Sequence, residues 1–592
     1  MEPSTELLFA RRKLEEIGGY ELLEDLVWDA TIPGWTMKFR ITISASGYSS
    51  DIPDTTDWHT VIHKNYPWGK IDIYPAREAG INLTFQHQNH NNVISETKWR
   101  SGKLCLDTTF GSFSLRGFNS EPRRSDQRLL WHTERCKMWL EAAATGQLVL
   151  KGQPFELPAF PLSKKGKYYF SENGTTFENL VSTKLQSGLA DVIIHSGNNS
   201  LFVAAFKDFS GKTLYTNVWN ESISDHKAKF KNAIWLRLNF IPVSLPWEAP
   251  ITWGKLYAIG KEHGQDLRKI ILEIYEKTYR HLPDCLLLGF PIPDKIGEDA
   301  VQLHWQPIAL PMHGSLKGFR PGNEAGELAK RTFQNDKNIM WMDSQNGNIN
   351  TISARGKLSE NLSQAKILLI GAGAVGSIIA ECLVRGTCHN LTIMDKDRIE
   401  LGNMSRHTLT LASLDHCKAQ ELSKRLNEIF PASNVSFNRS NIEQILDTDK
   451  AYLEQFDLVI DSTGSDQALH YISQALRATD KKFVSVSLGM NGNKLFQYQY
   501  QGSEDIESEF KKAFSPWLNQ EIETVEDNAL PREAIGCWHP LFPARVDDVW
   551  MMSSACIKLI ESYYTGADSL NTFIVIEQCG GEMFEGLKIT RS

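Results

Sequence analysis

Three glycines, Gly371, Gly373 and Gly376, lie in the stretch LLIGAGAVGS between two apolar runs. In a strand–turn–helix unit the first glycine would permit a tight turn and the second would let backbone N–H groups approach a phosphate. The third would allow the helix to pack closely on the strand. The amino terminus of the helix adds N–H groups and the positive end of its dipole. This spacing predicts a nucleotide site that could bind either a dinucleotide or ATP.

Charged residues after the glycines favour ATP. Asp395 ends the next apolar run, where it could bind a ribose hydroxyl, and Asp397, Asn403, Arg406 and Lys418 follow it. A nicotinamide dinucleotide carries only a pyrophosphate, which the glycine loop already serves, whereas a triphosphate needs further groups. Arg406 and Lys418 could neutralise phosphate charge while a carboxylate attacks the α-phosphorus. The pattern therefore predicts ATP and a reaction that activates a carboxylate.

Asp461 ends another apolar run, FDLVID, and is predicted to hold the Mg²⁺ that accompanies ATP. The segments that must position these residues alternate between strand and helix periods from about residue 350. They read KILLIGAG, AVGSIIAECLVRG, NLTIMDKD, DHCKAQELSKRLNEIF, NVSFNR, FDLVIDSTGS and KFVSVSLG. Such alternation predicts a parallel, doubly wound sheet.

Two of the nine cysteines stand in contexts that suggest a nucleophile. Cys537 lies in the loop-like segment REAIGCWHPLFPARVDD, near His539 and Arg545. Positive groups favour the thiolate, which is the form that attacks an acyl-adenylate. Cys105 lies in KWRSGKLCLDTTFG, after YPWGKIDIYP and the asparagine-rich FQHQNHNN. The other cysteines have no such context and are predicted to be structural.

The amino-terminal part of the chain is predicted to be an α+β domain. It opens with an amphipathic helix, continues with the strand candidates MKFRITIS, GKIDIYP and INLTFQ, and ends with the helical run HTERCKMWLEAAATG. The proline-rich stretch QPFELPAFPLSKKGK is predicted to be a linker. Strand-like runs and one amphipathic helix, GQDLRKIILEIYEKTYRHL, follow in a mixed α/β linker domain to which the residues assign no role. We expect domains at residues 1–155, 156–345 and 346–592.

Composition limits the partners of the protein. The formal net charge is −8 and the pI is about 6.1, so the chain lacks the positive charge on which nucleic-acid and anionic-membrane binding depends. The amino terminus has no apolar core of signal-peptide length, and the longest apolar stretch is interrupted by glycines. We therefore expect a cytoplasmic protein that binds neither nucleic acid nor a membrane.

Four separated motifs, GAGAVGS, DKDRIELGNMSR, HCKA and DLVIDSTGS, resemble in order and spacing the adenylation domain of ubiquitin-activating enzymes and their bacterial sulfur-carrier relatives, the ThiF family. The resemblance covers about residues 350–592 and implies a Rossmann-like adenylation domain. It implies that Asp395 binds ribose, that Arg406 and Lys418 contact phosphates and that Asp461 binds Mg²⁺. The family usually has glutamine where this chain has His407. An arginine before the first strand often reaches ATP across a dimer interface, and Arg355 is the candidate here.

The segment around Cys105 resembles the active site of ubiquitin-conjugating enzymes. Its matching residues are Tyr66, Pro67, Gly102, Leu104, Cys105, Leu106 and Asp107. In that family the cysteine accepts the activated modifier, and the asparagine of a His-Pro-Asn motif stabilises the oxyanion. This motif is absent at its usual distance before the cysteine, and Asn89 or Asn92 could replace it only if the intervening loop folds back.

A conjugating-like domain followed by an activating-like domain resembles the fused enzymes of bacterial anti-phage (CBASS) operons. The resemblance implies that the carboxyl terminus of a protein is adenylated, passed as a thioester from Cys537 to Cys105, and delivered to an amine on a protein. It also implies that the donor is a cyclic-nucleotide synthase encoded beside the enzyme and that the adenylation domains form a homodimer.

Three other functions are compatible with the residues. The chain could be a sulfur-carrier-type adenylyltransferase with an amino-terminal binding module, an NAD-dependent oxidoreductase, or an interaction scaffold with a decayed nucleotide pocket. Undiminished conjugation after mutation of Cys105 would favour the first, and tight NAD binding without pyrophosphate exchange would favour the second. Failure to bind ATP·Mg would favour the scaffold.

Overall fold

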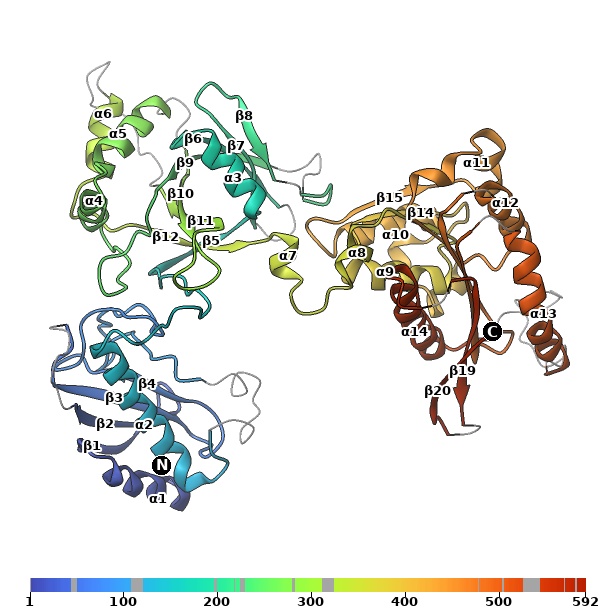
Figure 1. The fold of residues 1–592 in the computed structure, drawn as a ribbon. Coiled ribbons are helices and arrows are strands. Elements are labelled where there is room, and N and C mark those ends of the chain that lie inside the picture. The colour runs from blue at the N-terminus through green and yellow to red at the C-terminus, as the bar shows by residue number, and fades with distance from the viewer. Residues whose placement is uncertain are drawn as a thin grey trace. The chain divides into compact units, whose positions relative to one another are not determined.

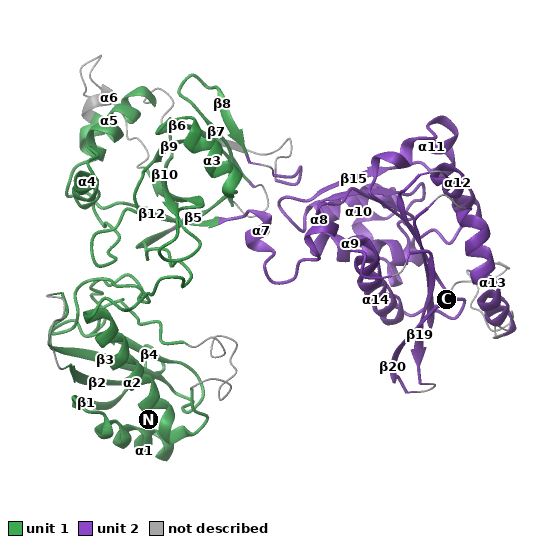
Figure 2. Cartoon of the chain, viewed as in Figure 1, with its two compact units in different colours: residues 1–194, 198–216, 230–345 green, residues 195–197, 217–229, 346–592 purple. Residues whose placement is uncertain are grey.

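A computed structural model of the chain describes residues 2–43, 51–107, 121–195, 200–217, 219–223, 229–278, 283–310, 324–477, 479–502, 505–524, 543–568, 570–580 and 583–592. The chain divides into two compact units (Figure 2). The first consists of residues 1–194, 198–216 and 230–345, and the second of residues 195–197, 217–229 and 346–592.

The amino-terminal domain is a four-stranded antiparallel sheet with two helices. Helix α1 (Thr5–Lys13) begins after Ser4, whose hydroxyl accepts the Leu7 N–H. Strands β1 (Tyr20–Asp29), β2 (Gly34–Thr42), β3 (Thr55–His63) and β4 (Ile71–Pro75) pair in sequence order. Helix α2 (Ser125–Ala144) packs on α1 and on β4. The predicted α+β layout with an opening helix is confirmed.

One predicted strand of this domain is wrong. Residues 81–86, INLTFQ, form no strand and are mostly irregular, although Ile81, Thr84 and Phe85 are buried. The buried Asn91 side chain donates hydrogen bonds to the carbonyl oxygens of Ile81 and Leu83 at 2.9 and 3.0 Å. Because a side chain satisfies these backbone groups, the apolar residues are buried without a sheet partner.

The central domain contains an eight-stranded mixed sheet. Its strands are β5 (Leu162–Phe170), β6 (Ser187–Ile194), β7 (Leu201–Lys207), β8 (Thr213–Thr216), β9 (Lys229–Arg237), β10 (Cys285–Ile292), β11 (Gln302–Ala309) and β12 (Trp341–Asn346), in the order β5-β12-β11-β10-β9-β6-β7-β8. Strand β5 also pairs with β7. The helices of this domain are α3 (Gly174–Ser182), α4 (Trp253–Glu262), α5 (Leu267–Thr278) and α6 (Glu324–Thr332).

The stretch 153–167, predicted to be a linker, is part of the central domain instead. Its last residues belong to β5, and Pro154 forms an antiparallel bridge with Lys295. The backbone N–H of Phe155 donates to the Asp294 carbonyl at 3.0 Å. Proline is compatible with an extended segment at the edge of a domain, so composition alone did not distinguish a free connection from a docked one.

The second unit contains a doubly wound sheet, as predicted. Its strands are β13 (Ile367–Ile370), β14 (Asn390–Met394), β15 (Asn434–Asn438), β16 (Leu458–Asp461), β17 (Lys482–Leu488), β18 (Lys494–Tyr500), β19 (Thr572–Cys579) and β20 (Gly586–Arg591). The order is β15-β14-β13-β16-β17-β18-β19-β20. The first five strands of this order are parallel to one another, and the last three continue the sheet as antiparallel strands.

The described helices of this unit include members on both faces of the sheet. They are α7 (Ile349–Ile352), α8 (Glu360–Gln364), α9 (Ala374–Arg385), α10 (Lys418–Asn427), α11 (Ile442–Thr448), α12 (Asp466–Leu476), α13 (Ile506–Thr524) and α14 (Val546–Tyr564). Helices α9 and α14 lie on one side and α12 and α13 on the other (Figure 1), each side with its own apolar core. Parallel strands place their carboxyl ends at one edge, so the residues that follow β13, β14 and β16 meet there. Within the described residues, no helix is both long and apolar enough to cross a membrane.

Candidate functional site

The glycine turn joins β13 to α9 at the carboxyl edge of the parallel strands. Gly371 has a φ of +91°, which a residue with a side chain rarely adopts. A Cβ atom on Gly376 would lie 2.0 Å from the Gly371 carbonyl oxygen, whereas a Cβ atom on Gly373 would meet no atom within 4 Å. The turn therefore has no room for a side chain at Gly376, whereas the space beside Gly373, directly before α9, is free of protein atoms.

Ala372, in the middle of this turn, is held through both of its backbone polar groups. Its N–H donates to Asp395 Oδ2 at 2.6 Å, and its carbonyl oxygen lies 2.6 Å from His407 Nε2. Asp395 Oδ1 also accepts the Asp397 N–H at 2.8 Å. Burial raises the pKa of Asp395 above its ordinary value. Asp395 thus positions the turn, a role beyond the ribose contact predicted for it.

His407 stands where the resembled family usually has glutamine, and its role was not predicted from the sequence. Because the Ala372 carbonyl can only accept, Nε2 carries the proton, and Nδ1 accepts the Leu409 N–H at 3.1 Å. Burial lowers the pKa of His407 to about 4, so the ring is neutral at physiological pH. A neutral imidazole donates here as a glutamine amide would.

The residues predicted to contact phosphates lie in the segment between Asp395 and α10. Lys418 is the first residue of α10, and its Nζ lies 3.4 Å from Asp397 Oδ2. The Asn403 side chain accepts the Glu400 N–H at 3.0 Å, and the Asn403 carbonyl accepts the Arg406 N–H at 3.0 Å. The structure therefore places Asn403, Arg406 and Lys418 on the segment that leads from the end of β14, beside the glycine turn, to the start of α10.

Asp461 is the last residue of β16 and pairs with Ile370 at the end of β13. It is 1% exposed, and its Oδ1 accepts the N–H and the hydroxyl of Thr463 at 3.0 and 2.7 Å. Burial raises the pKa of Asp461 to about 6. Mg²⁺ commonly takes one or two protein carboxylates together with phosphate oxygens and water, so a single buried carboxylate at the nucleotide edge fits this ion. Among the described residues, no three His, Cys, Asp or Glu side chains form a group that could hold a metal.

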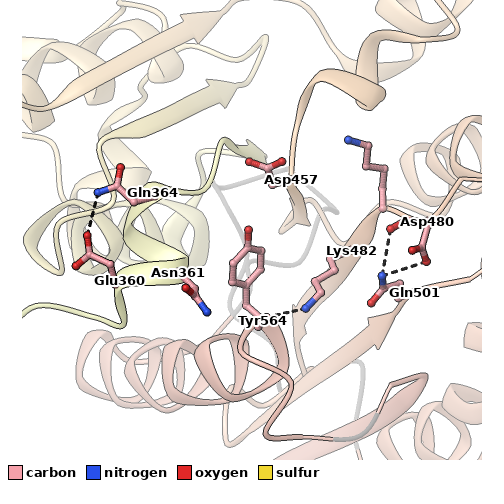
Figure 3. Close-up of a pocket in the computed structure, with 9 residues that line it drawn as sticks. Glu360, Asn361, Gln364, Asp457, Asp480, Lys482, Gln501 and Tyr564 are labelled. Atoms are coloured by element: carbon pink, nitrogen blue, oxygen red, sulfur yellow. Dashed lines mark hydrogen bonds between the residues drawn. The ribbon is translucent and has the colours of Figure 1, made fainter.

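A separate cavity of about 740 Å³ lies at the opposite edge of the parallel strands (Figure 3). Asp457 precedes β16, Lys482 begins β17, and Tyr564 ends α14. Lys482 Nζ donates to the Tyr564 carbonyl at 2.6 Å, and the Gln501 side chain donates to Asp480 Oδ1 at 3.0 Å. Nucleotides bind at the carboxyl ends of the strands in open α/β sheets, so this cavity is not the predicted ATP site.

Cys105 is the one exposed residue among the eight cysteines in the described part of the chain. Its N–H donates to the His87 carbonyl at 2.8 Å, and the Asn89 N–H donates to the Lys103 carbonyl at 2.9 Å. These two hydrogen bonds join residues 87–89 to residues 103–105 as antiparallel segments. The loop between residues 89 and 103 therefore folds back on itself. The condition under which Asn89 or Asn92 could serve Cys105 is therefore met.

The pairing also determines which side chains lie on the same face as the thiol. Gln88 and Leu104 form an antiparallel bridge and are both buried. Because side chains alternate along an extended segment, Asn89 and Cys105, which follow Gln88 and Leu104, lie on the other face. Asn89 and Cys105 are exposed, in agreement with this alternation.

The asparagine-rich stretch contains a structural residue that sequence reasoning missed. Asn91 is 1% exposed, and its Oδ1 accepts Arg100 Nε at 3.1 Å. A Cβ atom on Gly102 would lie 2.5 Å from the same Oδ1. An apolar residue flanked by polar ones would have been the usual signal of burial, and an asparagine beside other asparagines gives no such signal.

The predicted donor cysteine and its neighbours are described only in part. Cys537 and His539 lie outside the described residues. Arg545 forms an ion pair with Asp547, whose Oδ2 lies 2.6 Å from Arg545 Nη2. Arg355 is exposed in the turn between α7 and α8, before β13. A contact of Arg355 with ATP in a partner subunit stays a prediction.

Known proteins are similar to this chain over nearly its whole length. Residues 146–347 match the family described as "Cap2 central linker domain", and residues 344–527 match the ThiF family. The "ATP-dependent ubiquitin transferase-like protein Cap2" of Enterobacter hormaechei subsp. hoffmannii is 32% identical over 542 residues, which cover 89% of each chain. A "Probable molybdopterin-synthase adenylyltransferase" of Porphyra purpurea is 27% identical over 24% of this chain and 37% of its own.

Among solved structures, E. coli MccB with succinimide is 14% identical and covers 39% of this chain and 65% of its own, with a TM-score of 0.29. The identity and the coverage of the Enterobacter relative, together with the central linker and ThiF matches, settle the assignment. This chain belongs to the family of Cap2 ATP-dependent ubiquitin transferase-like proteins.

Proposed function

We propose that this chain adenylates the carboxyl terminus of a protein and passes the acyl group through two of its own cysteines to an amine. As a member of its family it is a ubiquitin-like activating and conjugating enzyme. The donor carboxylate attacks the α-phosphorus of ATP and releases pyrophosphate. The Cys537 thiolate then displaces AMP to form a thioester, and the Cys105 thiolate takes the acyl group by exchange. An acceptor amine finally displaces Cys105.

The observation that carries this proposal is that one chain holds both a glycine turn of nucleotide type and an exposed cysteine on a conjugating-like domain. Asp395 and His407 hold the turn, so its N–H groups need little reorganisation to meet phosphate oxygens. Arg406 and Lys418 would neutralise charge on the phosphates. Mg²⁺ bound at Asp461 would supply further charge neutralisation.

Asn89 is the candidate that we favour for stabilising the oxyanion at Cys105. Residues on the same face of an antiparallel pair, displaced by two positions, have backbones about 7–8 Å apart, which a side-chain amide can span toward a substrate. An oxyanion forms when sulfur or nitrogen attacks the thioester carbonyl, and an amide N–H donor would stabilise it. Asn89 is exposed on the face of Cys105, whereas Asn92 lies three residues further along the loop and is half-buried.

The substrate and the assembly are proposed from the family resemblance. The donor would be the carboxyl terminus of a cyclic-nucleotide synthase encoded beside the enzyme, in an anti-phage system. The acceptor would be an amine on a protein. The adenylation domains would form a homodimer in which Arg355 could reach the ATP of the partner subunit.

The relay can be tested on a non-reducing gel with the purified chain, ATP, Mg²⁺ and the adjacent synthase. The unmutated chain should exchange pyrophosphate into ATP and form a thiol-sensitive adduct. Cys537→Ala should retain pyrophosphate exchange and lose both thioesters, whereas Cys105→Ala should retain the adduct on Cys537 and lose the conjugates. Cys579→Ala, at a half-buried cysteine, is the control and should behave like the unmutated chain. Absence of pyrophosphate exchange with the true donor would refute the first step.

A second candidate function is a sulfur-carrier-type adenylyltransferase, which the match to a molybdopterin-synthase adenylyltransferase favours. In that case only the adenylation step would occur, and the amino-terminal domain would bind a partner. Pyrophosphate exchange by the unmutated chain, with no thioester on Cys105 and no conjugates, would support this alternative over the relay.

A further inference from the structure

The loop that pairs with the Cys105 segment is contacted by two carboxylates from outside the amino-terminal domain. Glu156 Oε2 accepts the His87 N–H at 3.0 Å and lies 3.0 Å from His87 Nδ1. Glu248 Oε2 accepts the Thr84 N–H at 2.8 Å. All of these residues belong to the same compact unit, drawn in green in Figure 2. The two carboxylates therefore bind backbone N–H groups on one short segment of the loop.

Both carboxylates are held by the central domain. The Phe155 N–H next to Glu156 donates to the Asp294 carbonyl at 3.0 Å. Glu248 exchanges two backbone hydrogen bonds with Ser244, at 2.9 and 3.0 Å, and is 8% exposed. These hydrogen bonds hold the backbone from which the two carboxylates reach the loop.

The backbone conformation of His87 requires support from neighbouring groups. Its φ is +57°, a left-handed conformation that is uncommon for a residue with a side chain. Its carbonyl oxygen accepts the Cys105 N–H at 2.8 Å, so a change at His87 moves the backbone of the thiol directly. The hydrogen bond with Glu156 raises the pKa of His87 above its ordinary value, which favours a charged pair.

The negative charge of Glu248 also acts on Arg100, which donates hydrogen bonds to the same loop. Burial lowers the pKa of Arg100, and the charge of Glu248 opposes that shift. The Arg100 guanidinium donates to the Asn91 carbonyl at 2.8 Å and to Asn91 Oδ1 at 3.1 Å. The Asn91 N–H in turn donates to Thr84 Oγ1 at 3.0 Å. Glu248 thus holds Thr84 directly, and its negative charge favours the charged form of the Arg100 guanidinium that donates to Asn91.

We propose that the central domain is the scaffold of the acceptor-cysteine site, in which Glu156 and Glu248 hold the loop 84–92 so that the His87 carbonyl and Asn89 stay beside Cys105. This inference rests on the proposed role of Cys105 as the acceptor thiol. Glu156 and Glu248 are positioning residues, because each acts through the backbone of the loop. The proposal gives the central domain a part in the transfer step.

The test uses the full-length chain with matched substitutions at each carboxylate. Glutamine keeps a hydrogen-bond acceptor and removes the charge, whereas methionine has a similar volume and no acceptor of comparable strength. The variants are Glu156→Gln, Glu156→Met, Glu248→Gln and Glu248→Met. Glu298→Gln, at an exposed carboxylate of the central domain, is the control.

Amide hydrogen exchange reports on the loop without any substrate. We expect exchange in residues 84–92 to accelerate about tenfold in the methionine variants and less in the glutamine variants, because only methionine removes the hydrogen bond in full. Exchange in β2 and β3 should not change, which would show that the domain remains folded. Loop exchange equal to that of Glu298→Gln would overturn the scaffold proposal.

Acyl transfer from Cys537 to Cys105, followed in a single turnover with the adjacent synthase, reports on the thiol. The methionine variants should transfer the acyl group about tenfold more slowly than the unmutated chain, and the glutamine variants should have intermediate rates. Pyrophosphate exchange should be unchanged in all four variants. Faster loop exchange with normal transfer would overturn the role in positioning Cys105. If the unmutated chain forms no Cys105 thioester, the relay fails, and hydrogen exchange still decides whether the carboxylates hold the loop.

Discussion

His407 shows how one side chain can replace another of different shape. Its neutral ring donates to the Ala372 carbonyl and accepts the Leu409 N–H, so it ties the segment after β14 to the glycine turn. The sequence marked this position only as a departure from the resembled family. The hydrogen bond to Ala372 joins residues that are far apart in the chain, and only the fold brings them together.

Replacement of His407 should weaken ATP binding in proportion to the hydrogen bonds lost. His407→Ala removes both, and we expect the Kd for ATP·Mg to rise about tenfold, corresponding to about 1.4 kcal/mol. His407→Gln keeps an amide donor and should stay within about threefold of the unmutated chain. Calorimetric titration with ATP·Mg measures both. The exposed His416→Ala is the control, and equal affinities for His407→Ala and His416→Ala would contradict the role of His407.

Two glycines of the turn should respond differently to alanine. Gly376→Ala places a Cβ atom 2.0 Å from the Gly371 carbonyl oxygen, and we expect a loss of about 3 kcal/mol in the free energy of unfolding. Gly373→Ala meets no atom within 4 Å and should cost at most about 1 kcal/mol, as alanine at a helix N-cap does. Its effect should instead be a weaker affinity for ATP. Urea unfolding and ATP titration separate the two, and a stable Gly376→Ala variant would refute the packing argument.

At the scale of elements, helix α2 is anchored by a buried ion cluster near its start. Arg128 Nε donates to Glu121 Oε1 at 2.8 Å, and His132 Nε2 lies 3.3 Å from the same oxygen. The Glu121 and Arg128 side chains are 10% and 8% exposed. Burial alone would raise the pKa of Glu121, but the hydrogen bonds from His132 and Arg128 lower it to about 2. The carboxylate is therefore charged at neutral pH despite its burial.

Glu121→Gln should destabilise the amino-terminal domain strongly, because Arg128 would remain buried without an opposite charge. We expect the free energy of unfolding to fall by about 3 kcal/mol and calorimetry to show a lower Tm. Lys98→Ala is the control, since the Lys98 and Glu24 side chains of its ion pair are 71% and 46% exposed. Such a pair contributes at most about 1 kcal/mol. If Glu121→Gln and Lys98→Ala lowered the free energy of unfolding equally, burial would not explain the contribution of the ion cluster to stability.

The glycine turn, the strands around it and α9 could be predicted because their signals are local. An apolar run, glycines at fixed spacing and a second apolar run determine a strand, a turn and a helix within a short stretch of sequence. The INLTFQ segment has the same local apolar character but is not a strand, since the buried Asn91 takes up its backbone carbonyls. Local pattern cannot reveal a partner that the fold supplies.

At the scale of the whole molecule, each domain contains a histidine that burial keeps neutral. Burial lowers the pKa of His59, His304 and His407 to about 4. These residues lie in the amino-terminal, central and adenylation domains, respectively. In the unfolded chain they would titrate near the ordinary histidine value of about 6.5.

The three histidines should lower the stability of the chain as the pH falls from about 6.5 toward 4, because the unfolded chain binds protons that the folded chain excludes. Each decreases the free energy of unfolding by up to about 1.4 kcal/mol per pH unit. Asp461 and Glu172 act in the opposite sense, since burial raises the pKa of both carboxyls and the folded chain takes up their protons first. The net slope should therefore be smaller than the histidines alone would give, and urea unfolding at pH 7, 6 and 5 measures it.

His304→Gln should isolate the contribution of one histidine to this acid response. Glutamine has no proton to gain, so the unfolding free energy of the variant should decrease less between pH 6.5 and 4 than that of the unmutated chain. The exposed His416→Gln is the control and should leave the slope unchanged. The same slope in both variants would show that burial of His304 does not govern the acid response.

The sequence by itself determined the class of each domain, the position of the glycine turn and the family that the motifs resemble. These features depend on residue types at short spacing, which local sterics and hydrophobic periodicity translate directly into structure. Only the tertiary structure decided that His407 and Asp395 hold Ala372, that Asn89 lies on the face of Cys105, and that Glu156 and Glu248 meet the loop beside it. Those contacts join residues from distant parts of the chain, and their formation depends on how the packed elements place them.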